Sequence, residues 1–184
     1  MLSSPGVTRA PRAVSAEKDA RGRRTVEITM TITAPPATRW LDDDQQRVWR
    51  AWLLGTAVLN ERLDAQLREH DLDLAEYEIL VTLSESSDRQ LRMAELADAV
   101  HQSRSRLTHT VTRMEKRGLI ERTTCPVDRR GVWANLTDAG QELLTEAAPS
   151  HVECVRRNFV DSVAPDDYAA LGRAMRAILE APSA

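Results

Sequence analysis

Two adjacent arginines on a predicted turn, Arg129 and Arg130, are residues whose types and spacing point to chemistry. Arg129 and Arg130 lie in "CPVDRRGVWANLT" (125–137), between two short runs of strand-forming residues. We predict a β-hairpin with both arginines at its tip, where Asp128 fixes the turn or pairs with one of them. Guanidinium groups at such a tip can enter a minor groove of DNA, whose negative potential attracts arginine.

A second group of polar side chains recurs with helical spacing upstream. Ser103 is a suitable N-cap and Gly118 a suitable C′ residue for a helix between them. At 100° per residue Leu107, Val111 and Met114 share one face, which we predict to turn inward. The other faces carry hydroxyls, an imidazole and cations that can donate to phosphates and read base edges. With Arg129 and Arg130, we assign these residues to DNA binding: Ser103, Arg104, Ser105, Arg106, Thr108, His109, Thr112, Arg113 and Lys116.

The charge of the chain is distributed unevenly. The overall net charge is −3, but residues 101–130 hold eight basic residues against three acidic ones, so this segment is +5 and the remainder is −8. A basic island on an acidic body is the electrostatic footprint of a surface that docks on a polyanion. An ordinary solvated helix surface would mix both signs.

The bulk properties indicate one helical domain in a reducing compartment. The chain has 184 residues, of which 42% are hydrophobic, 29% charged and only 4% aromatic. No apolar run approaches the ~20 residues that a membrane span needs, and the N-terminus lacks the apolar segment of a secretory signal. Two cysteines, Cys125 and Cys154, make no disulfide framework. We therefore expect a cytoplasmic protein.

The elements that must position these side chains are predicted by the period of the apolar residues. A long helix begins at Asp42–Asp43 and runs to about Arg68, and a second covers Leu74–Ser84. "SSDRQ" (86–90) then forms a polar break. Helices over Met93–Val100 and Ser103–Arg117, joined by a brief turn, make a helix-turn-helix, to which the hairpin adds a wing.

Two further helices follow the hairpin. Thr137 or Asp138 caps the first, and Pro149 should kink or split it. The last helix opens at Ala164-Pro165, with proline in an early position. The first helix and these last two carry more apolar surface than one small lobe can cover, so we expect a two-fold dimer. Its two recognition helices would read half-sites about 10 bp apart.

The predicted fold is mainly α with a small β-hairpin wing. We expect an N-terminal extension over residues 1–38, disordered or arm-like, ahead of one domain over 39–184. Within that domain, 74–137 form a winged helix-turn-helix lobe, and 39–70 and 138–184 form dimerisation helices.

Over about residues 40–180 the sequence resembles the MarR (multiple antibiotic resistance regulator) family. The resemblance rests on the order of the elements and on "MAELADAV", "SRSRLTHTVTRMEKRGLIER", "DRRGVWANLTDAG" and "AAPSHVECVRRNF". It implies a winged-helix homodimer that binds pseudo-palindromic operator DNA, in most members as a repressor released by a small phenolic or aromatic-acid ligand. It also implies that Arg130 enters the minor groove and that Ser103–Arg113 face the major groove.

The resemblance places an effector pocket between the dimerisation helices and the DNA-binding lobe. The candidates for it are Trp49, Trp52 and Tyr77, with Glu78 and His70 beside them. The alternative is that the two tryptophans belong to the core of the dimer.

Two other sites are less strongly indicated by the sequence. Cys125, near Arg122 and Arg129, would be an oxidisable thiol if those cations lower its pKa, but an incidental thiol is the simpler interpretation. His151 and Cys154, three residues apart on a helix, could serve a metal, but with only four histidines scattered along the chain an incidental pair is the simpler interpretation, so we expect no metal and no cofactor.

The sequence therefore predicts a DNA-binding transcription regulator that acts as a homodimeric repressor released by a small aromatic ligand. A nucleophile–base pair, a phosphate-binding glycine loop and a metal cluster are all missing from its motifs, so we expect no enzyme. The alternatives are a redox-responsive regulator acting through Cys125 and a dimeric interaction module that does not bind DNA.

Overall fold

The structure, a computed structural model, describes residues 39–124 and 131–182. The fold described below is that of the unit from Asp42 onward. The predicted extension over residues 1–38 lies outside the described residues. So does the tip of the predicted hairpin, with Cys125, Asp128, Arg129 and Arg130.

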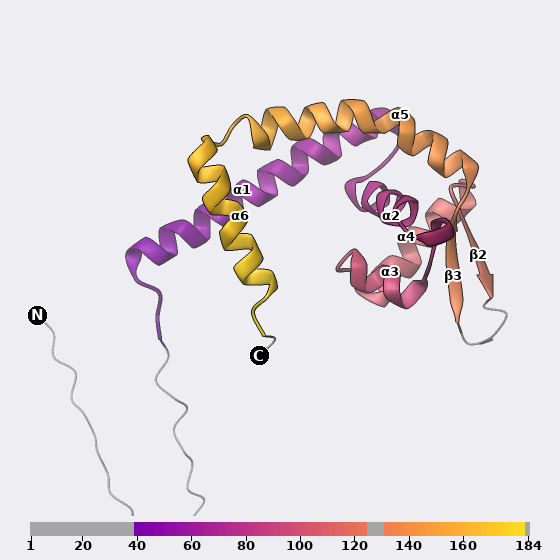
Figure 1. Ribbon diagram of the computed structural model, residues 1–184, viewed down its shortest axis with the longest axis horizontal. Helices are drawn as coiled ribbons and strands as arrows, with labels where there is room; N and C mark the ends of the chain where they lie inside the picture. Colours follow the sequence, from indigo (N-terminus) through magenta and orange to yellow (C-terminus); the bar gives the residue numbers. More distant parts are fainter. Residues whose placement is uncertain (1–38, 125–130, 183–184) are drawn as a thin grey trace, which may run out of the picture. The chain divides into compact units, whose positions relative to one another are not determined.

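Helix α1 (Asp43–Leu67) begins where the sequence predicts it. The Asp42 carboxylate accepts the Gln45 backbone N–H at 2.8 Å, while the Gln45 side chain accepts the Asp42 N–H at 3.1 Å, a reciprocal cap of the first turn. The second half of α1 packs along α5 (Asp138–Val155), as Figure 1 shows. Gln66 donates to the Ser150 hydroxyl at 2.9 Å across this contact.

Helix α2 (Leu74–Ser84) is the centre of the core, and its bounds are those predicted from the sequence. Ile79, Leu80 and Leu83 are fully buried. They pack with apolar side chains of α3, α4, the sheet and α5, so that one helix joins the elements around it. The core cluster also includes Leu67, Leu72, Tyr77, Leu96, Ala97, Leu107, Val111, Met114, Leu119, Ile120, Ala134, Leu136, Leu144 and Ala147.

Helices α3 (Met93–Ala99) and α4 (Arg104–Lys116) form the predicted helix-turn-helix. The Ser103 hydroxyl caps α4 by accepting the Arg106 N–H at 3.3 Å. Gly118 ends the helix at φ 72°, a left-handed conformation that costs glycine nothing. The capping residues predicted for α4 are both confirmed.

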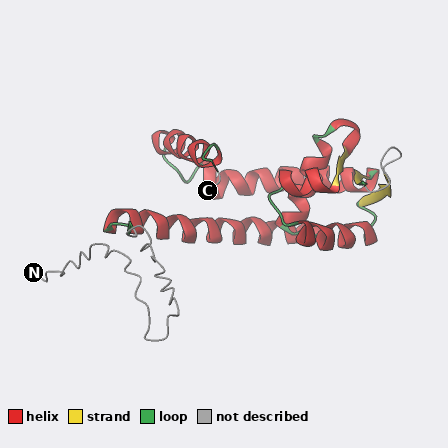
Figure 2. Ribbon diagram, turned by 90° about the horizontal axis from the view of Figure 1, so that it is seen from below, coloured by secondary structure: helices red, strands yellow, loops and turns green. Residues whose placement is uncertain are grey.

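The wing strands are also confirmed, but the sheet contains a strand that the sequence did not reveal. Strands β2 (Ile120–Thr124) and β3 (Val132–Leu136) pair antiparallel, and β1 (Gln90–Arg92) adds to the far edge of β3, giving the order β1-β3-β2. Figure 2 shows these strands at one end of the helical body. The prediction that "SSDRQ" is only a break was wrong at Gln90, because a three-residue strand is too short to show alternation and depends on its partner.

Helix α5 is not split at Pro149. It runs from Asp138 to Val155 with Thr137 as its N-cap, since packing of Ala147 and His151 on the core holds it on both sides of the proline. The irregularity comes later, as a π-helical turn over Arg156–Val160. Helix α6 (Pro165–Leu179) then begins with proline at its first position, as predicted.

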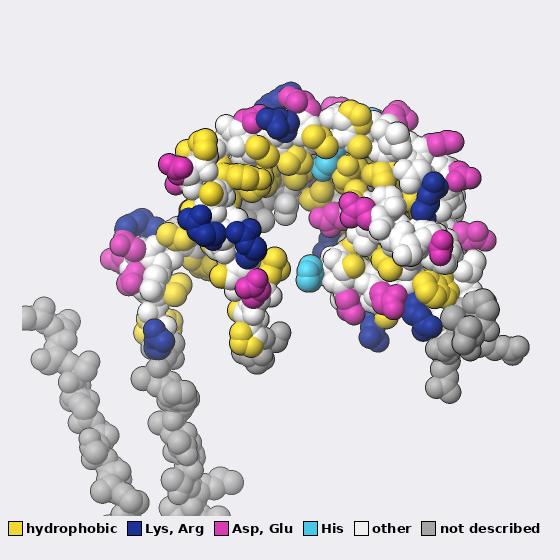
Figure 3. Space-filling view, viewed as in Figure 1, with side chains coloured by type: hydrophobic (Ala, Val, Ile, Leu, Met, Phe, Trp, Pro, Cys, Tyr) yellow, Lys and Arg dark blue, Asp and Glu magenta, His cyan; other side chains and the backbone are white. Residues whose placement is uncertain are grey.

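Large apolar side chains remain exposed on α1 and α6. Ile178 is 64% exposed and Trp49 53%, and Figure 3 shows hydrophobic side chains gathered over α1, α5 and α6. Among the described residues, no helix is both long and apolar enough to cross a membrane. The exposed large apolar side chains on α1 and α6 are Val48, Trp49, Trp52, Leu53, Leu54, Tyr168, Ile178 and Leu179.

Candidate nucleic-acid interface

The inner face of α4 is as predicted and slightly wider. Leu107, Val111 and Met114 are at most 1% exposed. Thr110, which the sequence pattern did not assign to this face, is also buried, and its hydroxyl donates to the Arg106 carbonyl at 3.2 Å. That bond gives the buried hydroxyl a hydrogen-bond partner, so Thr110 can lie on the inner face of α4.

The outer face of α4 presents a continuous polar surface. Arg104, Ser105, Thr108, His109 and Lys116 are exposed, and Thr112 is half-buried. The Thr108 and Thr112 hydroxyls donate back to the carbonyls one turn earlier, both at 2.7 Å. Because these hydroxyl hydrogens are used within the helix, the two oxygens keep lone pairs that can accept, which suits the amino groups of adenine and cytosine in a major groove.

Arg113 lies at the edge of this face and is held by carboxylates of α2. Its guanidinium contacts Asp73 at 2.7 Å and Glu76 at 3.2 Å, and Arg117 reaches the other oxygen of Glu76 at 3.2 Å. Hydrogen bonding to Glu76 is the main reason that the pKa of Arg113 is raised above its usual value. Glu76 is only 4% exposed, so these bonds tie α4 to the first turn of α2. The sequence pattern did not reveal this network, because its members are some 40 residues apart.

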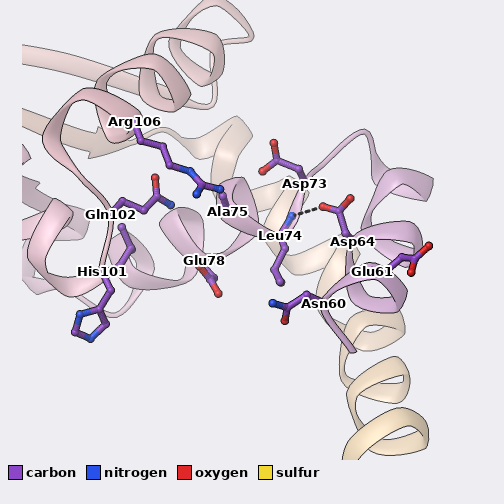
Figure 4. A pocket seen from close by; sticks show the side chains of 11 residues that line it. Asn60, Glu61, Asp64, Asp73, Leu74, Ala75, Glu78, His101, Gln102 and Arg106 are labelled. Carbon is purple, nitrogen blue, oxygen red and sulfur yellow. Dashed lines mark hydrogen bonds between the residues drawn. The ribbon is translucent and has the colours of Figure 1, made fainter. Parts of the chain in front are cut away.

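Arg106 leaves the outer face in the other direction. It lines a pocket of about 610 Å³ between α1, α2 and the turn before α4, and Figure 4 shows it extending from α4 toward the start of α2. Four carboxylates share this lining: Glu61, Asp64, Asp73 and Glu78. Partial burial raises the pKa of Glu78, while the Arg106 charge opposes that shift.

A second, more apolar pocket of about 440 Å³ adjoins the first and contains one of the predicted effector residues. Tyr77 lines it together with Glu78 and His151, and the Tyr77 ring lies 4.2 Å from the His151 ring. Burial raises the pKa of the Tyr77 hydroxyl and lowers that of His151. Trp49 and Trp52 do not line either pocket, because they lie at least two helical turns earlier on α1 than its lining residue Asn60.

His70 lies apart from these pockets, between α1 and α5. Its Nε2 is 3.0 Å from the Ser150 hydroxyl, and its Nδ1 is 3.8 Å from the Glu146 carboxylate. Glu78 therefore lines the same pocket as Tyr77, whereas the neighbours of the His70 side chain are on α5.

The base of the wing lies beside the first turns of α3 and α4. Arg92 at the end of β1 is the register partner of Trp133 on β3, and its guanidinium carbon is 5.5 Å from the centre of the indole ring. A groove of about 360 Å³ runs from Arg92 to Arg104 and Thr108 on α4 and to Gly131 and Val132 on β3. On the other strand, Arg122 pairs with Glu115 of α4 at 2.5 Å, which lowers the pKa of that carboxyl.

The weaker candidates of the sequence find ordinary surroundings. Cys154 is partly buried, with its Sγ 3.4 Å from the Asn158 side chain. His151 lies against Tyr77, with Nδ1 3.3 Å from the Gln66 oxygen. Across the described ranges, no three His, Cys, Asp or Glu side chains gather as metal ligands would.

Known proteins share both the sequence pattern and the fold. The sequence model of the MarR family matches residues 72–132. Transcriptional repressor MprA of Escherichia coli K12 is 30% identical over 99 residues, which cover 54% of this chain and 56% of MprA. The chain thus spans little more than half the length of that relative.

Two solved structures from Streptomyces coelicolor match over nearly their whole length. AbsC, a MarR family transcriptional regulator, is 45% identical with a TM-score of 0.74, over 78% of this chain and 97% of AbsC. Sco3205, a MarR family transcriptional regulator solved in complex with DNA, is 41% identical with a TM-score of 0.76, over 81% of this chain and 95% of Sco3205. With the winged helix-turn-helix described above, these matches show that the chain belongs to the MarR family of transcriptional regulators.

Proposed function

We propose that this protein is a cytoplasmic homodimeric repressor that binds a specific operator and leaves it when a small phenolic or aromatic-acid ligand binds. The observation that carries the DNA-binding part is the outer face of α4, where Arg104, Thr108 and His109 are exposed beside the wing strands. An exposed helix of this kind fits a major groove, and its cations supply the salt-dependent part of the affinity. The DNA-bound structure of Sco3205 supports the same use of the fold.

Within this proposal the side chains divide by their bonding. Arg104 and Lys116 contact phosphates, while Ser105, Thr108, His109 and Thr112 contribute to sequence choice. Arg113 pairs with Asp73 and Glu76, and the charge of Arg106 acts on Glu78, so we expect both arginines to contribute less to phosphate binding than a cation without acidic neighbours. Ser103 shapes the site as the cap of α4, and Arg129 and Arg130 act from the wing.

The ligand part of the proposal rests on the two adjoining pockets near Tyr77. They lie between α1, α2 and the turn before α4, so an occupant would touch both the long helix and the base of the recognition helix. BpsR of Bordetella bronchiseptica, whose DNA binding is regulated by 6-hydroxynicotinic acid, shares the fold at 18% identity. Trp49 and Trp52 line neither pocket within one chain, so they would contact the ligand only through a second copy of the chain.

The test is fluorescence anisotropy of the protein on labelled intergenic DNA beside its own gene, against a shuffled duplex of the same length. Tight selective binding that salicylate or a related phenolic acid weakens supports the whole proposal. Selective binding that responds only to oxidants moves the regulation to Cys125. Equal, weak binding to both duplexes contradicts operator recognition on this DNA and returns the interaction module to consideration.

Arg130→Ala tests the wing. We expect it to weaken operator binding by about 1–3 kcal/mol, because the guanidinium that enters the minor groove is removed from both half-sites. The measurement is the same anisotropy titration, with thermal unfolding to show that the variant is folded. Unchanged affinity in a folded variant would remove Arg130 from the interface.

Ile178→Glu tests the dimer. Ile178 is 64% exposed in the single chain, and a second copy covering α1 and α6 would bury it. A carboxylate there should raise the dimer dissociation constant by at least about tenfold, since it would be desolvated without a partner. Sedimentation velocity measures this, with Arg173→Glu on the same helix as the control. A dimer as stable in Ile178→Glu as in Arg173→Glu would remove Ile178 from the interface.

A further inference from the structure

We propose that Arg92 and Arg104 together bind the DNA sugar-phosphate strand that passes between the recognition helix and the wing, and that the Trp133 ring positions Arg92 for this. The proposal rests on the proposed function, because it takes α4 and the wing as the DNA-binding elements. Neither Arg92 nor Trp133 belongs to the recognition-helix face or the hairpin tip that the sequence motifs single out.

In B-DNA one sugar-phosphate strand separates a major groove from the neighbouring minor groove. A protein that places a helix in one and a wing in the other must straddle that strand. Side chains that lie between the helix and the wing base therefore face phosphates.

The structure has a groove in this place. It is bounded on one side by Arg104 and Thr108 of α4 and on the other by Gly131 and Val132, where β3 leaves the wing. Arg92 and the start of α3 complete its lining. The volume of about 360 Å³ is enough to admit a phosphodiester group with its hydration.

The charge of the groove suits a phosphate. Two guanidinium groups contribute to the lining, and none of its described residues is a carboxylate. Figure 3 shows dark blue Lys and Arg side chains at the lower edge of this lobe, with magenta Asp and Glu side chains beside them.

The Trp133 ring supplies the orientation of Arg92. The two residues are directly opposite on β1 and β3, so their side chains share one face of the sheet. With its carbon 5.5 Å from the ring centre, the guanidinium is within cation–π range. A guanidinium that stacks on a ring can still donate hydrogen bonds from its edge, and it loses less freedom when it binds phosphate.

The measurement is the salt dependence of binding for Arg92→Ala, on both the intergenic duplex and the shuffled one. Removing one phosphate contact should reduce the slope of log affinity against log salt by about 0.9, or about 1.8 for the two sites of a dimer. We expect binding weaker by on the order of 10- to 30-fold at about 0.15 M salt, equally on both duplexes, because a phosphate contact carries no sequence information.

Matched variants separate this contact from a structural role. Arg92→Lys keeps the charge and should keep the wild-type slope. Arg157→Ala removes an arginine that pairs with Glu153 at the exposed end of α5, away from the wing, and it should leave both the affinity and the slope unchanged. Trp133→Leu should weaken binding in the wild-type background but add nothing to Arg92→Ala, since the ring acts through the arginine. If Arg92→Ala does not fold, Arg92→Gln, which keeps most of the stem, takes its place.

The results distinguish this inference from the proposed function. A wild-type slope in Arg92→Ala, with selective binding by the wild-type protein, overturns the inference alone. So does an effect on one duplex only, which would make Arg92 a base-reading residue. Weak binding of the wild-type protein to both duplexes contradicts the proposed function, and the inference falls with it.

Discussion

Replacing both Arg113 and Arg117 by alanine is expected to lower the free energy of unfolding by about 3–5 kcal/mol. The two guanidiniums are the partners of Glu76, which is only 4% exposed and pairs with each at 3.2 Å. Without them a carboxylate would remain in a buried place with the backbone N–H of Asp73 as its remaining donor. Urea unfolding at neutral pH, followed by circular dichroism, measures the loss.

Two comparisons show whether the buried charge is the cause. Adding Glu76→Leu to the double variant should recover part of the stability, because the uncompensated carboxylate is then gone. Arg122→Ala breaks the Arg122–Glu115 pair, but Glu115 is about one-third exposed, so the loss should stay near or below about 1 kcal/mol. Equal losses in the Arg122 variant and the double variant would count against the network.

The same network has a consequence for DNA binding. Since Asp73 caps α2 and Glu76 lies in its first turn, their pairs with α4 hold the recognition helix against the element that also lines both pockets. A weaker affinity of Arg113→Ala for DNA would therefore include a change in the seating of α4 as well as the removal of a cation. Arg117 is less exposed than Arg113, so the DNA affinity of Arg117→Ala would report mainly the position of α4 on α2.

Gly140→Ala is expected to cost about 3 kcal/mol of stability, although alanine is the better helix former. A Cβ at Gly140 would lie 2.3 Å from the Leu119 carbonyl oxygen and 2.7 Å from Leu136 Cδ1. The first is backbone, and it also accepts the Thr137 N–H at 3.2 Å, so it cannot move without losing that bond. The first turn of α5 would have to separate from the wing strands.

Gly118 is the matched control, because its glycine is required for a different reason. Nothing lies within 4 Å of its missing Cβ, and only its φ of 72° opposes a side chain. Gly118→Ala should therefore cost about 1 kcal/mol, and Gly118→Asn less, since asparagine tolerates this conformation. Thermal unfolding of the three variants gives the order. A loss for Gly140→Ala no larger than that of Gly118→Ala would contradict the close contact.

The helices were predictable because their signals are local. Asp42, Ser103 and Thr137 cap the helices that follow them, and their side-chain oxygens act within three residues. The stripe of Leu107, Val111 and Met114 follows from the period of the α-helix alone. The same reasoning placed α2 at its observed bounds, so the mainly α architecture and the position of the recognition helix needed no tertiary information.

The pairings between distant residues were not predictable, because nothing within a few residues of each partner signals them. Strand β1 exists because Leu91 meets Ala134, and helix α5 continues through Pro149 because its buried residues pack on α1 and α2. The separation of Tyr77 from Trp49 and Trp52 belongs here as well, since the sequence shows which residues are aromatic but not which share a pocket.

By itself, then, the sequence determined the elements, the polar outer face of α4 and the family resemblance, because capping, helical period and net charge act over short distances along the chain. The tertiary structure decided how the cations near that face are used. Arg113 is drawn to Glu76 across 37 residues, and Arg92 is placed over Trp133 by the pairing of two strands. Long-range contacts of this kind arise only when the core brings its helices and strands together, and they are what turns a pattern of charges into a specific surface.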